Sequence, residues 1–189
     1  MKKLYYVRHG QSGVNTDDTF STARDNLELK KLTRKGIKQA ENGAATAIER
    51  GLKFDLIICS PYLRTKQTAA IIAKKCSYPV EKIVYSELFI ELGYGTLGGK
   101  SWSKYWKSGK TYQNLGEYEG AETIEQLQLR AQKALDYVKS LPNDNVLIVS
   151  HSAFGRALKR AVDNQPYTLE FTMPKEGKSL PFGKILEYV

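Results

Sequence analysis

The chain has 189 residues, of which 41% are hydrophobic and 26% are charged, a composition ordinary for a globular domain and unlike that of a disordered chain. Its 29 basic and 20 acidic residues give a formal net charge of +9, which suits a nucleic acid, an anionic membrane surface or a small phosphorylated substrate. No apolar run approaches the roughly 20 residues of a membrane-spanning helix, and the run 4–7 is too short for a signal-peptide core. We therefore expect a cytoplasmic protein that does not bind membranes.

Two further features of the composition narrow the class of protein. Cys59 and Cys76 lack the multiple spaced pairs of a disulfide scaffold or a zinc site, which also favours a reducing compartment. The lysines are scattered along the chain and match no helix-turn-helix, zinc-finger or RNA-recognition pattern, so a nucleic-acid partner is not expected.

Three short apolar runs predict buried β-strands, at residues 4–7, 56–59 and 146–149. Because long helical patterns separate them, they indicate a mostly parallel sheet with helices on both faces. The tail, 167–189, alternates apolar and polar residues between turns, which predicts short strands or a hairpin at the end of the sheet. The expected fold class is α/β, a three-layer α/β/α domain over residues 1–189 with no repeat or linker.

Helical spacing of apolar residues predicts four helices, over 33–50, 64–75, 123–141 and about 154–162. The apolar face of the first is expected to comprise Ile37, Ala40, Ala44, Ala47 and Ile48. The apolar face of the third is expected to comprise Ile124, Leu127, Ala131, Ala134, Leu135 and Val138.

Polar residues follow each predicted strand. The first strand leads to Arg8 and His9, the second to Arg64 beyond a Ser-Pro pair, and the third to His151. The carboxyl ends of parallel strands meet at one edge of a sheet, where ligands bind beside helix N-termini. A lone histidine is most often a surface or packed residue, but both histidines of this chain occupy equivalent strand ends. They indicate a shared site.

This set of residues suits phosphoryl transfer, which needs a nucleophile, positive charge around the phosphoryl oxygens and a proton for the leaving group. Histidine and arginine meet the first two needs, and the planar arginine fork binds phosphate oxygens in pairs. Glu91 is the candidate proton donor, because it precedes a glycine-rich stretch, 93–99, that can approach a ligand closely. Glu87 is nearby, and without the rest of the pattern either glutamate would be interpreted as solvated.

Taken together, these motifs resemble the histidine phosphatase superfamily, also called the phosphoglycerate mutase-like family. The resemblance covers most of the chain and rests on several segments in order. They are Tyr6-Val7-Arg8-His9-Gly10-Gln11 with Asn15, Leu32–Ala40, Ser60–Ala69, Glu91–Gly99 and Val149-Ser150-His151. A lone Arg-His-Gly would be weak, but motifs in this order and spacing are not. The resemblance implies a phosphoglycerate mutase-like fold.

The resemblance also implies a role for each core residue. His9 would attack phosphorus and become a phosphohistidine, which water then hydrolyses. Arg8, Arg64 and His151 would bind and neutralise the phosphoryl oxygens. Glu91 would protonate the leaving oxygen and later deprotonate the attacking water. No metal or other cofactor is expected, because two arginines and a histidine take the role that magnesium has in kinases.

Four further residues are candidates for phosphate or substrate contacts. Gln11, Ser12 and Asn15 would either make such contacts or shape the turn after the first strand, and the backbone amide of Ser152 would add a donor near a helix N-terminus. Ser152 also stands where the family often has glycine. The family's usual Gly-Arg-x-Gln-Gly loop is missing from 16–31, and so are the substrate contacts that it would supply.

The segment 100–122 carries five aromatic residues among lysines and would either cap the cleft or pack onto the domain as an irregular insertion. The five are Trp102, Tyr105, Trp106, Tyr112 and Tyr118. A phosphatase acting on a small organic phosphate monoester is favoured over a phosphomutase, because family mutases are usually longer chains. A non-catalytic phosphate-binding protein is the alternative from another class. The chain is expected to be a monomer or a homodimer.

Overall fold

The computed structural model describes residues 2–21, 30–165 and 179–189. Its sheet has five strands in the order β3-β2-β4-β1-β5, and the first four of these run parallel while β5 is antiparallel to β1. The strands are β1 (Lys3–Arg8), β2 (Leu56–Cys59), β3 (Val84–Tyr85), β4 (Asn145–Ser150) and β5 (Ile185–Glu187). The three predicted strands are confirmed, and the sheet is mostly parallel as expected.

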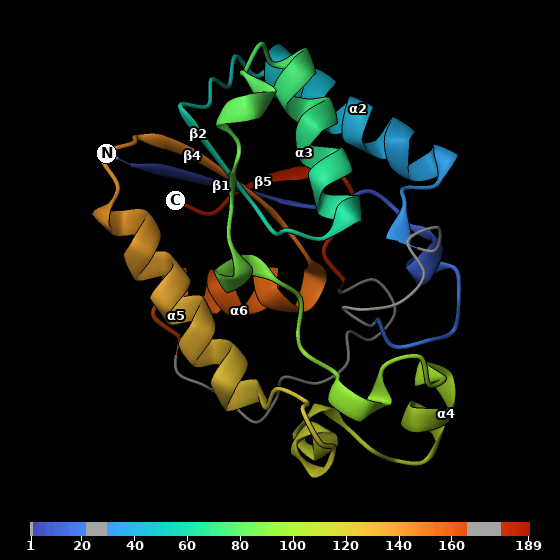
Figure 1. Cartoon of the computed structure of the whole chain (residues 1–189). Coiled ribbons are helices and arrows are strands. Elements are labelled where there is room, and N and C mark those ends of the chain that lie inside the picture. The colour runs from blue at the N-terminus through green and yellow to red at the C-terminus, as the bar shows by residue number, and fades with distance from the viewer. Residues whose placement is uncertain (1, 22–29, 166–178) are drawn as a thin grey trace.

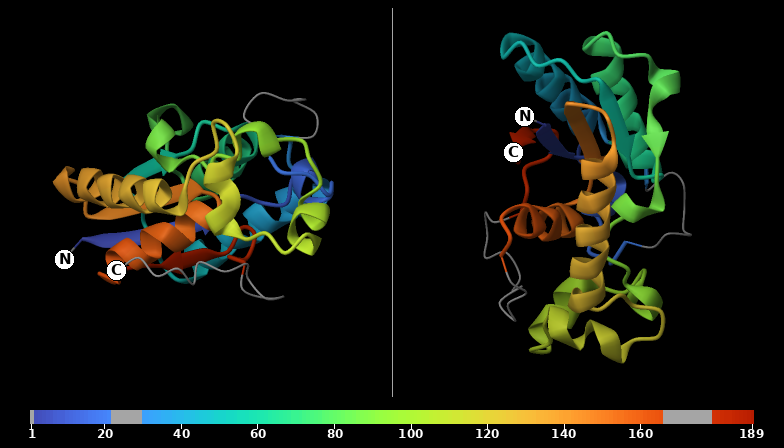
Figure 2. Two further views of the ribbon diagram at one scale, coloured as in Figure 1. Left: turned by 90° about the horizontal axis from the view of Figure 1, so that it is seen from below. Right: turned by 90° about the vertical axis from the view of Figure 1, so that its left-hand side faces the viewer.

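Helices cover both faces of this sheet, which confirms the three-layer α/β/α class. They are α2 (Arg34–Glu49), α3 (Leu63–Lys75), α4 (Trp102–Lys107), α5 (Ile124–Ser140) and α6 (Ser152–Val162). Figures 1 and 2 show α2 and α3 on one side of the strands and α5 and α6 on the other, with α4 standing off from the sheet. The helix predicted from about Phe154 begins two residues earlier, at Ser152.

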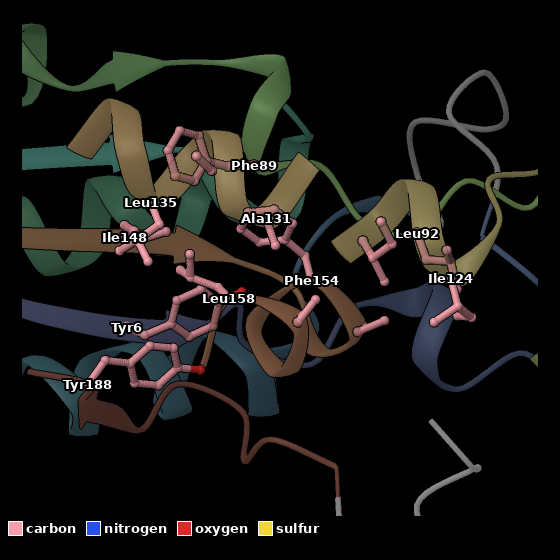
Figure 3. Close-up of a cluster of buried hydrophobic side chains, with 14 of the residues drawn as sticks. Tyr6, Phe89, Leu92, Ile124, Ala131, Leu135, Ile148, Phe154, Leu158 and Tyr188 are labelled. Carbon is pink, nitrogen blue, oxygen red and sulfur yellow. The ribbon is translucent and has the colours of Figure 1, made fainter. Parts of the chain in front are cut away.

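The strands bury both faces because their side chains alternate between two hydrophobic cores. Tyr6 and Ile148 point to the core beneath α5 and α6, whereas Tyr5 and Leu147 point to the core beneath α2 and α3. Figure 3 shows the first of these cores, in which the Tyr6 ring stacks on Tyr188 with 5.0 Å between ring centroids. The six residues predicted for the apolar face of α5 are all buried.

The prediction for α2 is wrong at two positions. Ile37 and Ile48 are 42% and 53% exposed, because the buried face is made of small residues and these two lie beyond its edges. The buried residues are Gly36, Ala40, Gly43, Ala44 and Ala47. Small side chains let the helix axis approach the backbone beneath it. The hydrophobic pattern predicted the correct helical segment, but the predicted buried face was wider than the observed one.

One of the two tightest approaches involves Gly36, which lies beside the turn that follows β1. A Cβ on Gly36 would lie 1.9 Å from the Gln11 carbonyl oxygen, and one on Gly10 would lie 2.2 Å from the Gly36 carbonyl oxygen. The neighbouring atoms belong to the backbone and cannot turn aside. This contact therefore sets where the turn after β1 lies relative to α2.

The C-terminal tail contributes one strand. Residues 185–187 pair with β1 at the edge of the sheet, in line with the prediction of short strands there, whereas 167–178 lie outside the described residues. None of the helices in the described parts of the chain is both long and apolar enough to cross a membrane.

The contact between Gly10 and Gly36 predicts that Gly36→Ala destabilises the fold, because the added methyl group meets backbone rather than a movable side chain. We expect a loss of about 1–3 kcal/mol in unfolding free energy, measured by urea denaturation. Asn42→Ala, on the exposed side of the same helix, is the control and should change stability by less than about 0.5 kcal/mol. Equal stability of the two variants would contradict the close approach.

Candidate active site

The ends of the parallel strands open onto a cavity of about 570 Å³. Six of the predicted site residues line it, namely Arg8, His9, Asn15, Arg64, Glu91 and Ser152. His151 packs against His9 with 5.2 Å between ring centroids. Gln11 and Ser12 are not among the lining residues. The structure thus brings the five expected core residues to one edge of the sheet.

The surroundings of His9 fix which of its ring nitrogens carries the proton. Nδ1 lies 2.7 Å from the carbonyl oxygen of Gly10, which can only accept, so Nδ1 bears the proton. Arg64 donates from Nε to the other ring nitrogen, Nε2, at 3.2 Å. Because arginine can only donate, Nε2 carries no proton and its lone pair accepts this hydrogen bond. Both neighbours therefore select the tautomer with an unprotonated Nε2, which is the form that a nucleophilic histidine needs.

Arg64 contacts the second histidine as well. Its Nη2 lies 3.3 Å from His151 Nδ1, so this nitrogen accepts, and the other ring nitrogen donates to Ser60 Oγ at 2.8 Å. Nη2 also donates to Ser21 Oγ at 3.3 Å. The positive charge beside His9 therefore comes from arginine, with both histidines neutral.

Burial and arginine charge reinforce the neutral state of both rings. Burial, followed by the charges of Arg64 and Arg8, holds the pKa of His9 well below its usual range. Burial and the same charges lower the pKa of His151 well below its usual range too. A nucleophilic histidine must be unprotonated on its attacking nitrogen. The site meets this condition over the whole physiological pH range.

Both arginines have buried N–H groups without a hydrogen-bond partner among the described residues, Nε of Arg8 and Nη1 of Arg64. Arg8 donates from Nη1 to the Leu180 carbonyl oxygen at 2.9 Å, and its guanidinium lies 3.7 Å from the centroid of the Phe182 ring. Burial lowers the pKa of Arg8 to about 10, so it stays charged at neutral pH. Buried cationic donors without partners are suited to an anion.

Glu91 lies at the N-terminus of α6. Its Oε2 accepts from the Ser152 and Ala153 amides at 3.1 and 3.4 Å, and its Oε1 accepts from the Phe154 and Leu92 amides, both at 3.1 Å. The amides of Ser152, Ala153 and Phe154 belong to the first turn of α6, where amides have no partner within the helix and favour negative charge. The Ser152 amide was expected to donate to a phosphate, and in the structure it donates to the carboxylate of Glu91.

Arg130, which the sequence analysis did not single out, holds the Glu91 loop in place. It donates to the carbonyl oxygens of Leu88, Ile90 and Glu91 at 2.9–3.2 Å. Its guanidinium also pairs with both carboxylate oxygens of Glu122, at 2.7 and 2.8 Å. The one feature of the sequence that could have identified Arg130 is its position beside the apolar face of the predicted helix 123–141.

The contacts of Gln11, Ser12 and Asn15 stabilise the turn after β1. Asn15 Oδ1 accepts from the amide and the hydroxyl of Ser12, both at 2.9 Å. The side-chain oxygen of Gln11 accepts from Thr33 at 3.0 Å, where Thr33 is the N-cap of α2. Of these three residues only Asn15 also reaches the cavity. Substrate contact by the other two stays a prediction.

The far wall of the cavity is aromatic. Within segment 100–122, Trp102, Trp106 and Tyr112 line it. Tyr105 and Tyr118 instead contact each other, with 6.0 Å between ring centroids. The segment therefore contributes a cavity wall, and its buried residues Tyr105 and Tyr112 extend the core beneath α5 and α6.

The loop 17–21 is joined to this aromatic segment. The amide of Phe20 donates to the Lys100 carbonyl at 2.9 Å, and Gly99 donates to the Phe20 carbonyl at 3.0 Å. The Asp18 carboxylate accepts from the hydroxyls of Ser101 and Ser103, both at 2.5 Å. Two segments far apart in sequence thus form one wall.

Several lining residues were not anticipated. They are Val14, Thr19, Phe20, Ser21, Tyr94, Ala153, Arg156, Ser179 and Phe182. Most lie in loops or in the tail, where no periodic pattern indicates which side faces a cavity. Across the described residues, no group of three or more His, Cys, Asp or Glu side chains could hold a metal ion.

Comparison with known families agrees with this geometry. The model of the histidine phosphatase superfamily (branch 1) matches residues 4–175. The chain belongs to the histidine phosphatase superfamily. The match includes all five expected core residues and confirms the resemblance inferred from the motifs.

Relatives within the histidine phosphatase superfamily include mutases. The phosphoglycerate mutase of Schizosaccharomyces pombe is 31% identical over 165 residues, 82% of this chain and 76% of that protein. The 2,3-bisphosphoglycerate-dependent phosphoglycerate mutase of Rhizobium etli is 34% identical over 96 residues, 51% of this chain. That second match spans only 44% of the rhizobial protein.

Solved structures of the histidine phosphatase superfamily share the fold. The alpha-ribazole phosphatase of Shigella flexneri superposes with a TM-score of 0.72 over 87% of this chain and 81% of that one, at 21% identity. At this identity the likeness concerns the fold alone. The family model is named for phosphatases and the relatives in sequence are named as phosphoglycerate mutases, so these are the two activities to which the chain is related.

The lowered pKa values of His9 and His151 predict acid sensitivity of the fold. Below about pH 6.5 the unfolded chain takes up protons on both histidines while the folded chain does not, so stability falls as the pH falls. Each histidine should contribute a slope of about 1.4 kcal/mol per pH unit. In His9→Gln the slope between about pH 6.5 and pH 5 should be smaller by that amount, measured by urea unfolding. Identical slopes would contradict the burial of a neutral His9.

Proposed function

We propose that the protein hydrolyses a small organic phosphate monoester through a phosphohistidine intermediate on His9. The observation that carries this proposal is the lone pair on His9 Nε2, held beside Arg64 in a buried pocket. The partnerless donors Arg8 Nε and Arg64 Nη1 supply sites for phosphoryl oxygens. A nucleophile and cationic donors thus converge where a phosphoryl group would bind.

In the first step the lone pair of His9 Nε2 forms a bond to phosphorus while the bond from phosphorus to the ester oxygen breaks. Glu91, in its acid form, gives its proton to that oxygen, so an alcohol leaves. Arg8 and Arg64 neutralise the charge that develops on the phosphoryl oxygens. His151 lies against His9 and takes part in binding the same oxygens.

In the second step a water oxygen attacks phosphorus and the bond from phosphorus to His9 Nε2 breaks. Glu91 takes a proton from this water, which restores its acid form, and inorganic phosphate leaves. Between the two steps Glu91 is a carboxylate. The amides of α6 that it contacts are suited to that form, because they donate hydrogen bonds to its oxygens. The cycle needs no metal or other cofactor.

Residues 100–122 act as a cap within a single domain that spans 1–189. Three of their aromatic side chains line the cavity opposite the strand ends, and the segment is tied to the loop 17–21 by backbone hydrogen bonds. A cap of this kind shields the phosphohistidine side of the cavity and contacts the organic part of the substrate.

Phosphatase activity is favoured over mutase activity by the charges around the cavity. A mutase must hold a bisphosphate, and each phosphate calls for several cationic donors. Apart from Arg8 and Arg64, Arg156 is the one cationic side chain among the described lining residues. The mutase relatives nevertheless make interconversion of phosphoglycerates the activity to test alongside hydrolysis.

The decisive measurement is phosphate release by the wild-type protein and by His9→Ala, over a panel of phosphorylated metabolites. We expect release by the wild type and a loss of about a thousandfold or more in His9→Ala, because no other nucleophile lies at this position. Retained turnover in His9→Ala would overturn the mechanism.

The same preparations should be tested for interconversion of 2- and 3-phosphoglycerate. Interconversion with little phosphate release would identify a mutase instead. Neither activity, with phosphate still bound, would identify a non-catalytic binder.

Replacing Glu91 tests the proton transfer separately. Glu91→Gln keeps an oxygen to accept from the α6 amides but cannot donate a proton from a carboxyl group. We expect kcat to fall about 100-fold or more for an alkyl phosphate and much less for p-nitrophenyl phosphate, whose leaving group needs no proton. Glu87→Gln, four residues earlier on the same loop, is the matched control. An equal loss on both substrates would argue that Glu91 serves binding only.

A further inference from the structure

The cavity has a cationic side chain that the phosphoryl chemistry does not use. Arg156 lines it together with the aromatic residues of the cap. The first turn of α6 delivers Ser152 and Ala153 to the same cavity. Because Ser152 and Arg156 are four residues apart on a helix, they share one face and lie roughly 6 Å apart. Arg156 therefore lies about one helical turn from the amides that contact Glu91.

The guanidinium of Arg156 lies close to the aromatic cap. Its central carbon is 6.0 Å from the centroid of the Tyr112 ring. Burial raises the pKa of Tyr112, and the charge of Arg156 is the largest influence that opposes this rise. The same charge acts on Tyr94, whose pKa burial raises well above its usual range. The positive charge of Arg156 thus acts on Tyr112 and Tyr94, two aromatic residues of the cavity wall.

We propose that Arg156 binds a carboxylate of the substrate while the aromatic wall contacts a flat organic body between that carboxylate and the phosphate. This inference rests on the proposed phosphatase function and specifies its substrate class. One guanidinium matches one carboxylate, which it binds through two parallel hydrogen bonds. Trp102, Trp106 and Tyr112 line the cavity and give it an aromatic surface suited to a planar or apolar body. The probe chosen for the spacer is a benzene ring, a flat body that an aromatic wall would contact.

The test compares two esters that differ in one group, 4-carboxyphenyl phosphate and 4-carbamoylphenyl phosphate. The carbamoyl ester has the better leaving group, so a preference for the carboxyl ester cannot come from the chemistry of the leaving group. We expect the wild-type protein to show the higher kcat/KM for the carboxyl ester. Arg156→Gln should lower the ratio of the two kcat/KM values about 10-fold or more, because a charge-assisted contact is lost.

Two further variants test whether the effect comes from the positive charge at position 156. They exclude a general effect of net charge and a loss of folded protein. Arg156→Lys should recover part of the ratio, since it restores a cation without the planar fork. Lys159→Gln removes a positive charge from the same helix at a residue that does not line the cavity, and it should leave the ratio unchanged. The comparison within each variant cancels any general loss of active protein.

The outcomes distinguish a failure of the proposed role of Arg156 from a failure of the proposed phosphatase function. Hydrolysis of both esters with a ratio unchanged in Arg156→Gln overturns the role of Arg156 and leaves the phosphatase function intact. Hydrolysis of neither ester by the wild type overturns the phosphatase function, and the role of Arg156 with it. If Arg156→Gln does not fold, equal kcat/KM values for the two esters in the wild type still overturn the inference.

Discussion

The buried guanidinium of Arg64 is the interaction on which the rest of the site depends. It is 2% exposed, and the hydrogen bonds described for it go to neutral acceptors on His9, His151 and Ser21. Burying a charge without an ionised partner costs free energy. Arg64 also selects the tautomer of both histidines. An anion bound beside it would offset the cost of burial and, in the proposed mechanism, would meet a histidine that is already oriented for attack.

The position of Arg64 follows from the sheet. The strands β2 and β4 are adjacent and parallel, so the helix that follows β2 and the histidine that follows β4 reach the same edge. Glu91 comes to this edge by another route, through a loop that Arg130 holds. The proposed acid, Glu91, and the proposed nucleophile, His9, thus belong to separate elements, and their relative placement depends on packing across the sheet. This is why the core beneath α5 and α6 bears on the chemistry.

Sequence alone predicted the parts of this arrangement that depend on local signals. Buried parallel strands appear as uninterrupted apolar runs, and the residues that end them, including Arg8 and His151, could be placed at one edge by topology. The buried face of α2 was predicted less well. Ile37 and Ile48 are hydrophobic yet exposed, because the depth of a helix depends on how closely it approaches its neighbour, which spacing does not encode.

The remaining parts involve contacts between segments that no local pattern connects. The hydrogen bonds from Arg130 to the carbonyl oxygens of the Glu91 loop join a helix to a loop about 40 residues away, and the cation–π contact between Arg8 and Phe182 joins the first strand to the tail. Hydrogen bonds between the loop 17–21 and residues 99–103 have the same character. Because that wall is bonded within itself and belongs to segments other than the strands, its side chains can be exchanged without moving the strand ends. Given the proposed reaction at those ends, chains with this fold could acquire new substrates through the wall and keep one chemistry.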